Sequence, residues 1–74
     1  MNARQAVIEN IFMIQNLVLA CEEMATRMGI SPEEALDKKA AFYTKWCKSG
    51  AWDLRIRDAR AILRGEKPRT NVGA

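Results

Sequence analysis

The chain has 74 residues, of which 49% are hydrophobic and 28% charged, and its formal net charge is +3. A chain of this length is expected to form one small domain, and no apolar run approaches the roughly 20 residues that a membrane-spanning helix needs. A domain this small buries only about 60% of its unfolded surface, so a disulfide, a metal ion or a second chain is the usual source of further stability.

The first predicted helix covers about residues 3–28 and is apolar around most of its middle. One stripe of hydrophobic residues alternates at intervals of four and three, as in a packed helix: Val7, Ile11, Ile14, Val18, Cys21, Ala25 and Met28. A second stripe of Ile8, Phe12 and Leu19 lies about 120° around the axis. Because a surface helix ordinarily has one stripe, we expect this helix to be central or shared with a second chain.

A turn between two helices is predicted at residues 29–32. Gly29 suits the left-handed conformation that ends many helices. Ser31 can accept a hydrogen bond from a free backbone N–H of the next helix, and Pro32 lacks a donor that would be unpaired there. Glu34, three residues after Ser31, completes a capping box. The rules for helix ends therefore explain this stretch.

The same stretch also has the spacing of a helix-turn-helix. Ala25, Gly29 and Ile30 fit the first half of that motif. The second half fits poorly, because the helix that would enter the DNA groove begins with carboxylates that would repel phosphates: Glu33, Glu34 and Asp37. We therefore favour helix capping over DNA recognition by this element.

Two further helices are predicted at about residues 32–48 and 51–65, followed by a short flexible tail from residue 68. The buried stripe of the second helix is expected to contain Leu36, Ala40, Tyr43 and Cys47, with Ala35, Phe42 and Trp46 beside it. That of the third is expected to contain Trp52, Ile56, Ala59 and Leu63, with Ile62 beside it. The fold class is therefore all-α, a small single three-helix domain over residues 1–67.

The chain offers little for catalysis or metal binding. It contains no histidine, and its two cysteines, Cys21 and Cys47, match no zinc-ligand spacing. We interpret both as buried thiols of a reducing cytoplasm. The prediction is a cytoplasmic protein that is not an enzyme, with no cofactor, no metal and no small-molecule substrate.

Charge is divided unevenly along the chain. Residues 1–37 have a net charge of −4, and residues 38–74 have a net charge of +7. Most of the positive charge on the third helix lies at intervals of three and four residues: Arg57, Arg60, Arg64 and Lys67, extended by Arg69 and flanked by Arg55. Such a row can bind phosphates or an acidic partner. It can equally be the solvated face of a helix that pairs with the acidic half, which we favour.

Hydrophobic residues outside the expected core are candidates for an interface with another protein. Leu54 lies opposite the buried stripe of the third helix, and the two tryptophans flank the break at Ser49-Gly50. With the second stripe of the first helix, the candidates are Ile8, Phe12, Leu19, Trp46, Trp52 and Leu54. The chain thus has more apolar surface than one three-helix domain hides.

No family is recognised from these motifs, although the compact all-helical character resembles accessory proteins of phages and plasmids. The sequence favours a small regulatory protein that binds other proteins, as a homodimer or by docking on a larger cytoplasmic protein. The alternative is a small nucleic-acid-binding transcriptional regulator that uses the basic third helix and the partial helix-turn-helix.

Overall fold

The computed structural model describes residues 3–46 and 50–68. It contains three helices, α1 (Ala3–Met28), α2 (Pro32–Trp46) and α3 (Ala51–Leu63). The predicted all-α three-helix domain is confirmed. The predicted end of the second helix at residue 48 and the tail from residue 69, which includes Arg69, lie outside the described residues, as does Cys47.

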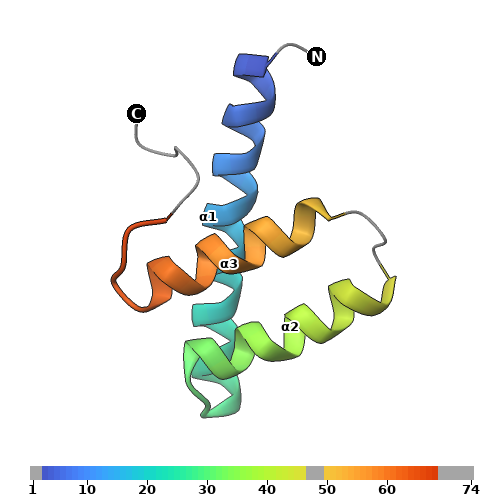
Figure 1. Ribbon diagram of the computed structural model, residues 1–74. Helices are drawn as coiled ribbons and strands as arrows, with labels where there is room; N and C mark the ends of the chain where they lie inside the picture. Colours follow the sequence, from blue (N-terminus) through green and yellow to red (C-terminus); the bar gives the residue numbers. More distant parts are fainter. Residues whose placement is uncertain (1–2, 47–49, 69–74) are drawn as a thin grey trace.

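The helices α2 and α3 run in opposite directions side by side, and both cross α1 (Figure 1). Each helix contacts the other two. The N-terminal part of α1 extends past the crossing with α3 (Figure 1). The longest helix therefore supports the other two, and part of its length is left uncovered.

The core lies where the three helices meet. Its buried apolar residues are Ile14, Leu17, Cys21 and Ala25 of α1, Ala35 and Leu36 of α2, and Ala59 of α3. Three of these seven residues are alanines, whose small side chains let helix backbones approach closely. Larger side chains close the sides of the core while partly exposed, among them Tyr43, Trp52 and Ile56.

The burial pattern corrects the predicted stripes at four residues. Leu17, which belongs to neither predicted stripe of α1, is buried, and Met28 at the end of α1 is exposed. Phe42 and Trp46, predicted beside the buried stripe of α2, are also exposed. The reason is visible in Figure 1, where the C-terminal end of α2 extends sideways beyond α1 and so has no α1 surface to pack against.

The turn between α1 and α2 has the predicted geometry, and α3 ends at Leu63, two residues before the predicted end. The Ser31 hydroxyl accepts a hydrogen bond of 3.1 Å from the Glu34 backbone N–H at the start of α2. Gly29 and Gly65 have φ values of 66° and 77°, the left-handed conformation that ends a helix. After α3, the Glu66 N–H donates to the Ala61 carbonyl at 2.8 Å and the Gly65 N–H donates to the Ile62 carbonyl at 3.0 Å, so carbonyls of the last turn are paired.

Enlarging the side chain at the α3 crossing is expected to destabilise the fold. Ala59 is fully buried, so Ala59→Leu forces the helices apart and lowers the free energy of unfolding by about 1–3 kcal/mol. Urea denaturation followed by circular dichroism measures this change. Ala41→Leu, on an exposed position of α2, is the matched control. Equal midpoints for the two variants would contradict the packing described here.

Candidate protein-interaction surface

One face of α1 exposes three large hydrophobic side chains. Ile8 is 58% exposed, and Phe12 and Leu19 are each 62% exposed. Successive helical residues are rotated by about 100°, so these side chains lie on the face opposite Ile14 and Leu17 in the core. We call the surface formed by Ile8, Phe12 and Leu19 the outer face of α1. The predicted second stripe is thus left uncovered by the chain's own helices.

A groove adjoins the outer face near the start of α3. It has a volume of about 280 Å³ and is lined by Ile8, Glu9, Phe12, Met13 and Arg55. The wall from α3 is fixed, because the Arg55 guanidinium donates hydrogen bonds of 3.2 and 3.1 Å to the Asn10 side-chain oxygen. The groove therefore has an apolar floor, with the positioned guanidinium of Arg55 and the carboxylate of Glu9 among its lining groups.

Trp52 belongs to the contacts that hold the helices together. Its ring stacks on Tyr43 of α2 with centroids 4.0 Å apart and planes inclined by 7°. The Arg55 guanidinium lies 4.9 Å from the Trp52 ring centroid, a cation–π contact. Since Arg55 also binds Asn10, these contacts join α2, α3 and α1. Trp52 and Arg55 therefore have structural roles in addition to their candidacy for binding.

Trp46, unlike Trp52, lies exposed at the end of α2. It is 65% exposed and lies beside Phe42, with ring centroids 6.4 Å apart. The Lys45 ammonium lies 5.3 Å from the Trp46 ring centroid. Leu54 of α3 is also exposed, as predicted from its position opposite the buried stripe. The end of α2 thus has its own small apolar patch, and the two tryptophans do not form one unit.

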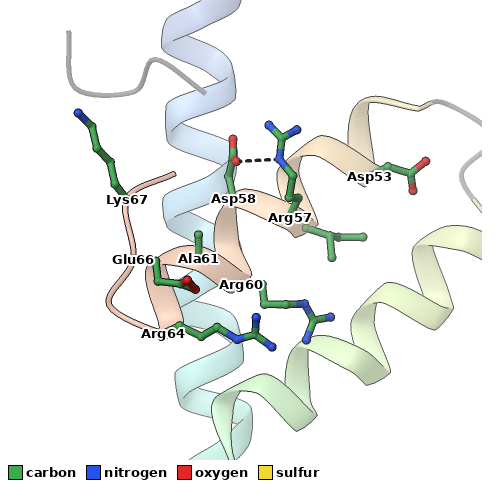
Figure 2. Close-up of a pocket in the computed structure, with 9 residues that line it drawn as sticks. Asp53, Arg57, Asp58, Arg60, Ala61, Arg64, Glu66 and Lys67 are labelled. Atoms are coloured by element: carbon green, nitrogen blue, oxygen red, sulfur yellow. Dashed lines mark hydrogen bonds and ion pairs between the residues drawn. The ribbon is translucent and has the colours of Figure 1, made fainter. Parts of the chain in front are cut away.

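Two arginines of the predicted basic row pair with acidic residues of α2. Arg60 donates a hydrogen bond of 2.7 Å to the Asp37 carboxylate and lies 3.9 Å from the Glu33 carboxylate. Arg64 forms an ion pair with Glu33. Both guanidinium groups point toward α2 in Figure 2. The acidic and basic halves therefore meet within one chain. Nucleic-acid binding by this row stays a prediction, and the two arginines that pair with α2 offer less positive charge to a phosphate.

A buried carboxylate beside this row was missed by sequence reasoning. Asp58 is only 1% exposed and accepts a hydrogen bond of 3.2 Å from the Arg57 Nε (Figure 2). Its position four residues before Ile62 places it at the edge of the buried stripe, which was the available signal. An acidic residue is ordinarily assigned to the surface unless its partner is known.

The depression along α3 has mixed charge. It has a volume of about 460 Å³, and its lining includes Arg57, Arg60, Arg64 and Lys67 as well as Asp53, Asp58 and Glu66. Lys67 projects away from the other labelled side chains (Figure 2). Because carboxylates balance the guanidinium groups, this surface lacks the uniform positive charge that a phosphate backbone would attract.

The thiol of Cys21 is expected to react slowly in the folded chain. Burial raises the pKa of this thiol above its ordinary value of 9.0, an effect that nearby Lys39 partly offsets. Less thiolate is then present at pH 8, so alkylation by iodoacetamide should be at least about tenfold slower in buffer than in urea. Mass mapping of the Cys21 peptide separates its reaction from that of Cys47. Equal rates in buffer and urea would contradict the burial of this thiol.

The sign of the same shift sets a pH dependence of stability. The folded chain favours the neutral thiol. The contribution of Cys21 to the free energy of unfolding is therefore complete below pH 9 and is lost as the pH rises above that value.

Among residues 3–46 and 50–68, no group of three His, Cys, Asp or Glu side chains could hold a metal ion. Nor does any helix in these ranges have the length and hydrophobicity to cross a membrane. Comparison with models of known protein families, with curated proteins and with solved structures found no match.

Proposed function

We propose that the chain is a small, non-enzymatic regulatory protein that binds another polypeptide through the outer face of α1. It does so as a homodimer or by docking on a larger cytoplasmic protein. The observation that supports this most is the exposure of Ile8, Phe12 and Leu19 on a helix whose opposite face already fills the core. Water contact with these side chains costs free energy that burial against a second chain would recover.

The grouping of these residues matters more than their number. A single exposed hydrophobic side chain is normal on a soluble protein. Here two of the three, Ile8 and Phe12, also line a groove with a cationic edge at Arg55. An apolar surface with a polar rim is typical of protein-binding sites. Phe42 and Trp46 form a second exposed apolar patch.

Two measurements with three proteins test this function. The wild-type chain, Leu19→Glu and Ala41→Glu are compared in sedimentation of the purified protein and in tagged pull-downs from the native host. Position 41 is exposed on α2 and receives the same charge, so it is the matched control. We expect self-association or capture of a defined protein, lost in Leu19→Glu and retained in Ala41→Glu. An 8.4 kDa monomer whose captured proteins do not change with Leu19→Glu would contradict the proposal.

A further inference from the structure

The outer face of α1 continues along the whole helix as one seam. Exposed residues follow each other at intervals of four and three, on the side opposite the core: Ile8, Phe12, Gln15, Leu19, Glu22 and Thr26. This is the spacing of the contact positions in a two-helix coiled coil. The Thr26 hydroxyl already donates a hydrogen bond of 3.1 Å to the Glu22 carbonyl. If another helix covers this position, the hydroxyl therefore keeps its hydrogen bond within α1.

We infer that a second copy of this chain covers the seam, with the two α1 helices antiparallel and Ile8 facing the partner's Leu19. The inference rests on the proposed function and names its partner. In this register the numbers of facing residues add to 27. Ile8 faces Leu19, and Phe12 faces Gln15, each pair occurring twice about the two-fold axis. The exposed apolar residues Ile8 and Leu19 are thus buried against each other.

The groove beside Ile8 and Phe12 fits this register. In antiparallel packing each side chain of one seam enters a hole between four residues of the other helix. The side chain facing Ile8 is the partner's Leu19, which enters on the side that Ile8, Glu9 and Phe12 line. The groove therefore receives an aliphatic side chain, the partner's Leu19, from the seam of the second copy.

Charge favours the antiparallel direction. Arg4 is exposed near the start of α1, and Glu22 and Glu23 are exposed near its end. When facing residue numbers add to 27, Arg4 is level with the partner's Glu23, and the partner's Glu22 is about 1.5 Å away along the axis. Arg4 and Glu22 also lie at the same angle around the helix, and so on the same side of the interface. A parallel pair in register would instead place like charges together at both ends.

Charge reversal tests direction and partner together. Arg4→Glu and Glu22→Arg each create two like-charge contacts in the antiparallel dimer, and each should raise the dissociation constant about tenfold at low salt. The double variant Arg4→Glu/Glu22→Arg restores both attractions and should recover wild-type affinity. Sedimentation equilibrium measures the three constants. A parallel dimer in register would show no change in the single variants, which would overturn the inference.

Cysteine cross-linking gives an independent test of the register. The double variant Ile8→Cys/Leu19→Cys should form a disulfide-linked dimer under mild oxidation. Neither single variant should do so above the wild-type level, because equal positions are about 16 Å apart along the axis. Cross-linking of Ile8→Cys alone would contradict the antiparallel register.

The same measurements separate this inference from the proposed function. A wild-type chain that remains an 8.4 kDa monomer at micromolar concentration would overturn the inference. The broader proposal would then depend on whether Leu19→Glu abolishes capture of a different protein.

Discussion

Replacing Leu36 by alanine is expected to lower the free energy of unfolding by about 2–5 kcal/mol. Leu36 is completely buried and lies in the core with residues from all three helices. Removing its side chain leaves a cavity that the three packed helices cannot readily close. Because a domain of this size has little stability to spare, most Leu36→Ala molecules should be unfolded at 37 °C.

Leu54→Ala is the matched control, since it removes the same atoms from a side chain that is 53% exposed. It should change the free energy of unfolding by less than about 0.5 kcal/mol. Urea titrations at one fixed protein concentration give both values, because association would otherwise shift the midpoints. Similar losses for the two variants would contradict the described core.

Phe12→Glu is expected to weaken binding through the outer face of α1 by at least about a hundredfold. Phe12 lies near the middle of the seam and lines the groove, so a bound partner would enclose the new carboxylate, and the Arg55 guanidinium of the groove is already hydrogen-bonded to Asn10. In a symmetric dimer the substitution occurs twice in one interface. Sedimentation equilibrium of the purified protein measures the effect.

The fold should survive this change. Phe12 is mostly exposed in the single chain, so the helical circular dichroism of Phe12→Glu at low concentration should match that of the wild type. Ala41→Glu, which adds the same charge to α2, should leave binding unchanged. Unaltered association of Phe12→Glu would show that this face is not the interface.

Local signals were sufficient to predict the helices. The spacing of hydrophobic residues in α1 and the residues at Gly29 and Ser31 depend only on near neighbours in the sequence. The exposure of Phe42 and Trp46 depends instead on where α2 crosses α1. That crossing depends on packing between residues distant in the sequence, such as Cys21 of α1 and Leu36 of α2 in the core, and no local pattern contains it.

The residues of the outer face of α1 could be grouped from the sequence, whereas the ion pairs between α2 and α3 could not. Ile8, Phe12 and Leu19 share a helix face, so a helical period alone groups them and predicts that they lie apart from the core. The ion-pair partners of Arg60 and Arg64 could not be predicted, because they depend on how α2 is aligned with α3. The opposite charges of the two halves predicted attraction, but they did not select Asp37 for Arg60 or bury Asp58.

The central claim is that another polypeptide covers the outer face of α1, and photo-cross-linking at position 12 tests it most directly. The photo-reactive amino acid benzoylphenylalanine replaces Phe12 with another aromatic side chain, and the same replacement at Ala41 is the control. Irradiation of native host cells should give a cross-linked product at position 12, at twice the 8.4 kDa mass of one chain if the partner is a second copy. No product at position 12 beyond that at position 41 would contradict the claim.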